Sequence, residues 1–297
     1  MVAILAEMNK FKGILAIIAS AFGFAIMAAC VRLCDDYGGA ISSFQKSFFR
    51  NIVAFVIALV VFCGDRPRKN DGDRPRSALA CPALWLRSIL GSVGIFANFY
   101  ALSHITIAEG QTLNKTAPFF TVIFAWLFLK ERPLWSQLLA VLMAFAGVVC
   151  VSKPGFAGAA GFPLAMGLLG GMCAGAAYAC VRKLAMQKVA PTFIVLFFSA
   201  FSCAASLPFM AAGFDAMTPA QVVILLGAGA GAAIGQFGVT WAYRLARPSE
   251  IAVYDYSNIF FTAALGFALF GQLPDVLALI GMAVIVAAAV FAHLMRR

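Results

Sequence analysis

The sequence predicts an all-α integral membrane protein with ten transmembrane helices, arranged as two inverted five-helix repeats. Of its 297 residues, 63% are hydrophobic and 11% are charged, whereas roughly 25% are charged in an ordinary soluble domain. A soluble fold of this length cannot bury so much apolar surface. The apolar residues also gather into runs long enough to cross a bilayer, and the second half of the chain repeats features of the first.

The helices follow from the lengths of the apolar runs, because a spanning helix needs about 20 mostly apolar residues. Such runs predict helices over residues 13–34, 41–63, 83–103, 106–129, 134–152, 162–182, 191–212, 220–243, 248–270 and 275–294. One long polar break separates the second and third of them, at residues 64–76. The first five helices form a predicted unit at 11–152, and the last five form a second unit at 161–294.

The basic residues predict the orientation of these helices. Most of the 22 Lys and Arg residues fall in segments on the same side as the N-terminus, whereas Asp35, Asp36, Asp215 and Asp275 fall on the opposite side. Because basic residues concentrate in cytoplasmic loops, we expect a multi-pass protein of the plasma (inner) membrane with both termini cytoplasmic. The net charge of +10 then needs no nucleic-acid partner.

The N-terminus allows a second interpretation. Lys10 and Lys12 precede an apolar run that ends in MAAC at residues 27–30, a weak likeness to a cleaved lipoprotein signal. The run is long enough to span a bilayer, which favours a retained first helix.

Cysteine and histidine usage argues against a metal, a disulfide framework or a bound cofactor. The eight cysteines contain no C-x-x-C pair, and most of them lie inside apolar runs, where cysteine behaves as a small hydrophobe. There are two histidines in the chain, too few for a histidine-built metal site.

The two halves align at a nearly constant shift. At a shift of 141 residues, Glu109 meets Glu250, the FFT sequence at 119–121 meets FFT at 260–262, and ACVR at 29–32 recurs at 179–182 with a slightly larger shift. Because each half has five helices, an odd number, the second half must start on the other side of the membrane and run inverted. Inverted repeats are typical of secondary transporters.

Small residues recur at every fourth position in two of the predicted helices. They are Gly167, Gly171 and Gly175 in one helix, and Gly227, Gly231 and Gly235 in the other. Such spacing predicts close helix packing in the membrane, either as a static contact or as a seam along which helices slide.

Several loose motifs carry a family resemblance. They are Arg50; Arg87, Gly91 and Tyr100-Ala101-Leu102; Ala108, Pro118 and WLFLKERP at 126–133; Gly147; and WAYRLARPSEIAVYDYS at 241–257. In order and spacing, the chain resembles the EamA-type ten-helix members of the drug/metabolite transporter superfamily. The resemblance implies a carrier of small metabolites with a central cavity. In the second half, Gln272 stands at the position equivalent to Glu131, and Ile259 at the position equivalent to Pro118. Substrate roles therefore cannot be assigned by strict symmetry.

Polar and ionisable side chains inside the predicted helices are the candidate site, because charge in hydrocarbon is costly and usually functional. The candidate substrate-binding residues are Lys46, Arg50, Asn98, Tyr100, Asn114, Lys115, Tyr254, Asp255 and Asn258. The candidate carriers of a coupling proton are Asp255, Glu109 and Glu250, because burial favours the protonated form of a carboxylic acid.

A structural role stays open for each of these residues. Asp255 can form a buried ion pair with Arg50 or Lys115, and Glu109 and Glu250 suit the first turns of helices. Arg87 and Glu109 lie near predicted helix ends, where interface positions are expected.

The predicted function is secondary transport of small polar metabolites, amino-acid-like or nucleoside-like and anionic or zwitterionic, by alternating access and in the direction of export. The chain has no P-loop motif, so ATP is not expected to drive it directly. Its partners are a small-molecule substrate and the lipid bilayer, and its state is a monomer or a homodimer. A passive channel or a structural membrane protein is the alternative. A lipid-modifying enzyme is less favoured, because no catalytic cluster is visible.

Overall fold

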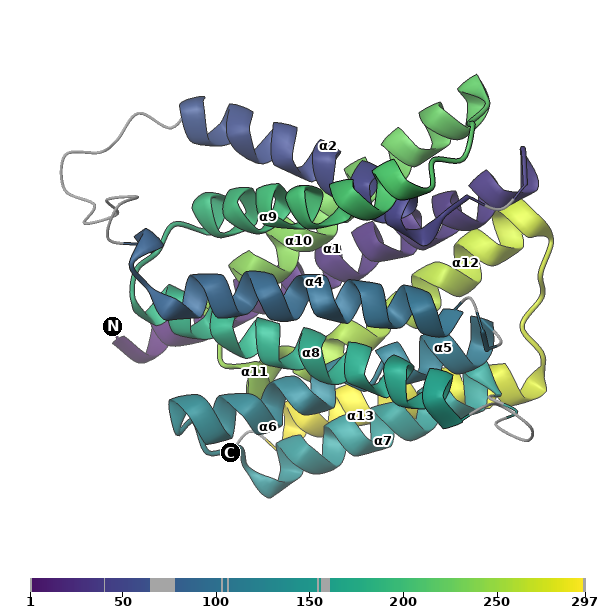
Figure 1. Cartoon of the computed structure of the whole chain (residues 1–297). Coiled ribbons are helices and arrows are strands. Elements are labelled where there is room, and N and C mark those ends of the chain that lie inside the picture. Colours follow the sequence, from purple (N-terminus) through teal and green to yellow (C-terminus); the bar gives the residue numbers. More distant parts are fainter. Residues whose placement is uncertain are drawn as a thin grey trace.

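The computed structural model describes residues 2–39, 41–64, 78–102, 104–105, 107–153, 155 and 161–295. All regular structure in this part of the chain is helical, and the helices form an elongated bundle with both termini at one end (Figure 1). We call this end the termini end. The opposite end carries the α1–α2 and α9–α10 connections (Figure 1).

The helices of the first half follow the order of the predicted spans. They are α1 (Val2–Asp36), α2 (Ser43–Gly64), α4 (Pro82–Leu102), α5 (Ile107–Asn114), α6 (Ala117–Leu129) and α7 (Trp135–Ser152). Those of the second half are α8 (Gly161–Met186), α9 (Pro191–Ala212), α10 (Pro219–Leu245), α11 (Pro248–Ile251), the 3₁₀ helix η1 (Ala252–Ser257), α12 (Asn258–Phe270) and α13 (Val276–Leu294). Every predicted span thus falls on helix, although α1 begins well before residue 13.

Two predicted spans are interrupted rather than continuous. The span predicted over 106–129 divides into α5 and α6 at Lys115 and Thr116, and the span predicted over 248–270 contains η1. The helices that follow the two breaks, α6 and α12, are each 13 residues long. Each ends at a residue in the left-handed region, Lys130 with φ 58° and Gly271 with φ 64°.

Eight helices in the described residues are long and apolar enough to cross a membrane. The two predicted spans outside this set are α4 and the segment from α11 to α12. The second has no uninterrupted helix of sufficient length because of η1. The first carries two strongly polar side chains, Arg87 and Asn98, within its 21 residues.

The closest packing joins helices from different halves of the chain. α1 packs along α10, α4 along α8, α7 along α13, and α2 along α9. Glycines permit this approach: a Cβ atom on Gly23 of α1 would lie 2.7 Å from the carbonyl oxygen of Gly231 and from the backbone nitrogen of Gly235 on α10. Close backbone approach of this kind drives helix association in lipid.

Glycines of α8 allow the break between α5 and α6 to pack closely against this helix. A Cβ atom on Gly171 would lie 2.6 Å from the carbonyl oxygen of Leu113, and it would also meet the hydroxyl of Thr116. Gly175 lies in the same way against the first turn of α6, where its Cβ would be 2.8 Å from the backbone nitrogen of Thr121. The glycine row predicted from the sequence therefore packs against the interrupted helix.

Candidate functional site

The two helix breaks bring a lysine and a carboxylate toward each other. Lys115 lies between α5 and α6, and Asp255 lies in η1. Each side chain is half-buried, and each senses the charge of the other, although they form no direct ion pair. An irregular backbone at membrane depth is tolerated where it is enclosed by protein or lines a cavity. Such breaks are typical of substrate sites in secondary transporters.

Arg87 of α4 is buried in the bundle, although its place near a predicted helix end also allowed an ordinary interface position. Its side chain is 1% exposed, and its Nη2 donates a hydrogen bond of 2.9 Å to Oε1 of Gln236 on α10. The guanidinium carbon lies 3.5 Å from the ring centre of Phe198 on α9. Counting residues from the helix end gives the position of Arg87 along α4, but it does not reveal that side chains of α9 and α10 bury it.

The Arg87 guanidinium keeps unused donors. Its Nε and Nη1 are buried and have no hydrogen-bond partner in the structure. Gly91, one turn along α4, leaves room for the group, because a Cβ there would come within 2.7 Å of Nη1.

Arg50 of α2 is the second arginine of this region. It is half-buried, its guanidinium carbon lies 5.9 Å from the ring centre of Phe24, and its buried Nε has no hydrogen-bond partner. The charges of Arg50 and Arg87 act on each other, and both act on the hydroxyl of Tyr178 on α8.

Tyr178 connects the arginines with the helix breaks, because it also senses the charge of Asp255. Its ring centre lies 5.6 Å from that of Tyr243 on α10. Sequence reasoning missed Tyr178, because the residues around it in α8 are apolar and the nearest charged residue, Arg182, follows four positions later.

Four other candidates lie within the bundle. Oδ1 of Asn98 is buried without a partner, and Tyr254 packs between the two largest hydrophobic clusters. Asn114 is half-buried at the end of α5. Asn258 is already engaged, since its Nδ2 donates to the carbonyl oxygen of Ala21 at 2.7 Å.

The remaining candidates lie toward the ends of the bundle. Lys46 forms an ion pair of 2.7 Å with Asp35. Glu250 pairs with Lys10 at 3.2 Å, and it accepts a hydrogen bond from the backbone of Arg247. Tyr100 is 40% exposed, and its ring stacks on His104. Glu109 belongs to α5, but its side chain lies outside the described residues.

A small cavity lies beside Tyr100. Its volume is about 240 Å³, and its lining residues are Ser42, Ser43, Phe44, Phe96, Phe99, Tyr100 and His104. It is lined mainly by aromatic side chains and lacks the charged groups found at the helix breaks.

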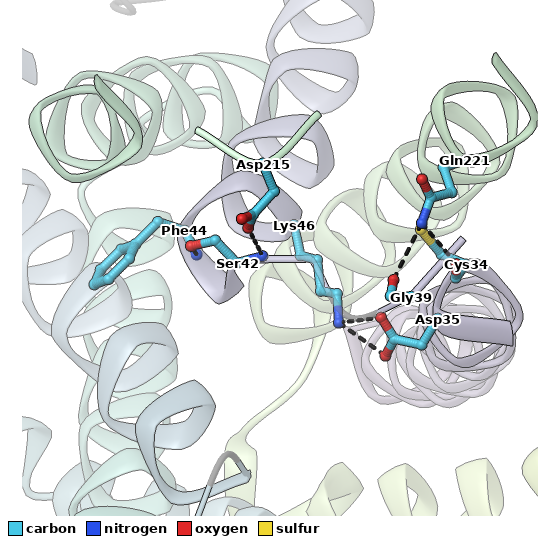
Figure 2. Close-up of polar contacts among 8 residues, drawn as sticks. All are labelled: Cys34, Asp35, Gly39, Ser42, Phe44, Lys46, Asp215 and Gln221. Carbon is cyan, nitrogen blue, oxygen red and sulfur yellow. Dashed lines mark hydrogen bonds and ion pairs between the residues drawn. The ribbon is translucent and has the colours of Figure 1, made fainter. Parts of the chain in front are cut away.

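Polar contacts hold together the helix connections at the end of the bundle opposite the termini end (Figure 2). The carboxylate of Asp215 accepts a 2.7 Å hydrogen bond from the backbone of Ser42, and Gln45 exchanges hydrogen bonds of 2.8 and 3.0 Å with the backbone of Asp215. Nε2 of Gln221 donates to the carbonyl oxygens of Cys34 and Gly39. These contacts join the α1–α2 connection to the α9–α10 connection, and we call them the end network.

Other ion pairs tie helix ends together. Arg182 of α8 holds Oε1 of Glu131 with two nitrogens, at 2.9 and 3.0 Å, which links α8 to the end of α6. Lys153 pairs with Asp275 between the end of α7 and the start of α13, and this hydrogen-bonded cation lowers the pKa of the exposed Asp275 carboxyl.

A multi-pass helical bundle with charged side chains at two interrupted helices is the architecture of a membrane transporter. The profile of the EamA-like transporter family matches residues 11–153. This match assigns the first half of the chain to the EamA-like transporter family. Together with the relatives described next, it indicates a multi-pass integral membrane protein that is a secondary transporter of small metabolites rather than an enzyme.

Similarity to known transporters extends along nearly the whole chain. The pseudopaline exporter CntI of Pseudomonas aeruginosa (strain UCBPP-PA14) is 26% identical over 283 residues, which cover 94% of this chain and 95% of that protein. A riboflavin transporter of Brucella anthropi is 26% identical, with 89% of this chain and 93% of that protein covered. A crystal structure with 20% sequence identity shares the fold, at a TM-score of 0.71 over 93% of this chain and 98% of the other.

Proposed function

We propose that this protein exports a small polar metabolite, amino-acid-like or nucleoside-like and anionic or zwitterionic, by alternating access. The observation that carries the proposal is the approach of Lys115 and Asp255 from two interrupted helices. Neither group is locked in a direct ion pair, so each can exchange its partner for a substrate group. Lys115 suits a carboxylate or phosphate, and Asp255 suits an ammonium group.

The same proposal includes two inverted repeats, at 11–152 and 161–294, as the moving parts. The helix pairing supports this, because α1 packs on α10 and α12 while α8 packs on α4 and α6. In the alignment of the halves, these are equivalent pairs. The interruptions and the left-handed residues at Lys130 and Gly271 also occur at equivalent positions.

The direction of transport is inferred from one relative. The Pseudomonas aeruginosa protein is named an exporter, whereas a relative from Rickettsia bellii, 26% identical over 259 residues, is named an S-adenosylmethionine uptake transporter. The exporter matches a larger part of this chain, 94% against 86%, which favours export.

The test compares metabolites inside and outside cells that make the protein with those of cells that do not. We expect a compound to accumulate in the medium only when the protein is present, and we expect Lys115→Ala and Asp255→Asn to abolish the effect. Lys183→Ala is the matched control, because Lys183 is an exposed lysine at the end of α8. Accumulation inside the cells would contradict export, and equal release by all variants would contradict the proposed site.

Once the compound is known, two measurements in proteoliposomes test the mechanism. Counter-transport, in which substrate on one side speeds movement from the other, is expected for a carrier and would be absent for a passive channel. A rate that is flat between about pH 5.5 and pH 8 would argue against Asp255, Glu109 or Glu250 as a proton carrier.

A further inference from the structure

Among the side chains that the structure describes, the centre of the bundle holds more cations than carboxylates; Glu109 lies outside this set. Arg50, Arg87 and Lys115 lie in the same region as one described carboxylate, that of Asp255. The charge of Asp255 acts on Lys115 and Tyr178, and the charges of both arginines act on Tyr178. None of the ion pairs among the described residues includes either arginine or Lys115. Among these described side chains, three cations against one carboxylate leave an excess of two positive charges.

Such an excess is costly in a membrane protein, because uncompensated charge is strongly disfavoured away from water. Arginine cannot relieve the cost by losing its proton. In stable membrane proteins a charge of this kind is paired with a counter-charge or serves a ligand.

The Arg87 side chain is held in place for binding. Gln236 fixes one end of the guanidinium through Nη2, and the ring of Phe198 fixes its plane. Nε and Nη1 are left without partners although they are buried. Nε and Nη1 lie on different edges of the guanidinium, so each can donate a single charge-assisted hydrogen bond to an oxygen of a carboxylate or phosphate.

Arg50 adds to this site from a different helix. Its buried Nε also lacks a partner, and its charge acts on that of Arg87. Two like charges kept in mutual range repel each other, and a bound anion would remove the repulsion.

We propose that Arg50 and Arg87 form an anion subsite separate from Lys115, and that the substrate is a dianion: a dicarboxylate or a phosphomonoester. One anionic group binds the arginines, and the rest of the molecule extends toward Lys115 and Asp255. The assignment of the substrate rests on the proposed transport function, since it places a transported molecule at the helix breaks.

The test measures binding of defined probes to the purified full-length protein in detergent. The probes are succinate for a dicarboxylate, glycerol 3-phosphate for a phosphomonoester and acetate for a single charge, all at the same ionic strength. We expect one dianion to bind at least about tenfold more tightly than acetate, because a further charged hydrogen bond contributes on that scale. The dianion that binds identifies which of the two chemistries the subsite takes.

Variants assign the binding to the arginines. Arg50→Gln and Arg87→Lys are each expected to weaken the dianion about tenfold or more. Arg87→Lys keeps the charge but loses the Nε and Nη donors of the guanidinium. Arg32→Gln is the control, since Arg32 is an exposed arginine that contacts Gln272 and Phe270. If Arg87→Lys does not fold, dianion binding by Arg50→Gln alone tests the proposal.

The proposal is overturned if neither dianion binds better than acetate, or if folded Arg50→Gln binds the dianion as the unmodified protein does. It also fails if the compound exported in a Lys115-dependent way carries fewer than two negative charges, although the transport function would then stand. Arginine-dependent binding of a dianion without any transported compound would support the subsite and contradict the transport function.

Discussion

At the scale of single residues, the site depends on polar atoms that lack ordinary partners. Nη2 of Arg87 donates to Gln236, and its Nε and Nη1 have no partner. Lys115 and Asp255 attract each other without forming an ion pair. By contrast, Lys46 and Glu250 are each bound in an ion pair near a bundle end. The first group is suited to take up a ligand, and the second is suited to hold helices.

The hydrogen bond from Arg87 to Gln236 can be tested directly. Gln236→Leu is expected to destabilise the protein by about 1–3 kcal/mol, because Nη2 of Arg87 would stay buried without its partner. The thermal unfolding midpoint in detergent measures the effect. Gln272→Leu is the control, since Gln272 is exposed, and equal midpoints for the two variants would contradict the prediction.

The site could be predicted only in part from the sequence. The polar residues of the interrupted segments, including Lys115 and Asp255, stand out because charge is rare in apolar runs. Arg87 was visible as a residue, but its burial depends on Phe198 and Gln236, which lie more than 100 positions along the chain. Tyr178 had no local signal, since its role depends on neighbours from four other helices.

At the scale of elements, the interruption between α5 and α6 depends on the glycine row of α8. Gly171 and Gly175 present bare backbone to residues 113–121, so the irregular turn at Lys115 and Thr116 fits without a gap. The sequence predicted a spanning segment over 106–129 but not its interruption. Hydropathy averages over a whole run, whereas a break depends on local hydrogen bonds such as that from the hydroxyl of Thr116 to the carbonyl of Leu113 at 2.6 Å.

Replacing a glycine of this row tests the fit. Gly171→Ala is expected to lower both the yield of folded protein and its transport rate, because the new Cβ would collide with the backbone oxygen of Leu113 at 2.6 Å. Gly227→Ala on α10 is the matched control, since the nearest atom there is the Cys30 sulfur at 3.6 Å.

Size-exclusion profiles and export by the same cells report both effects. A Gly171→Ala protein that folds and exports as the control does would show that the break does not require close packing against α8.

The end network is a second element-scale feature with a measurable effect. Gln221→Ala removes both hydrogen bonds that hold the chain around Cys34 and Gly39 (Figure 2). Because Cys34 is fully buried beneath this contact, we expect its thiol to react several-fold faster with a maleimide in the variant.

The labelling is done in a background in which the other cysteines are replaced by alanine or serine. Gln187→Ala, at an exposed position on the other side of the bundle, serves as the control. An unchanged labelling rate would show that other contacts keep this end closed.

At the scale of the whole molecule, the bundle has a direction that the basic residues predict. Both termini lie at one end (Figure 1), as an even number of crossings requires. The acidic Asp35, Asp215 and Asp275 lie at the helix connections of the opposite end. The positive-inside rule therefore predicts that the termini end faces the cytoplasm.

Reporter fusions test this orientation. We expect a fluorescent protein fused after Arg297 to fluoresce in cells and an alkaline phosphatase fused at the same place to be inactive, because that enzyme needs the oxidising periplasm for its disulfides. The opposite pair of results would reverse the orientation and place the end network at the cytoplasmic face.

The pairing of α1 with α10 also bears on how the protein is made. The two helices are separated by about 200 residues, which takes roughly 10–40 s to synthesise at typical rates. Until α10 enters the membrane, the glycine face of α1 has no partner and must rest against lipid or the insertion machinery. α4 waits for α8 in the same way, over about 80 residues or roughly 4–16 s, so the helices of the first half cannot complete their packing alone. Assembly therefore awaits the second half, and truncated chains are natural substrates for membrane quality control.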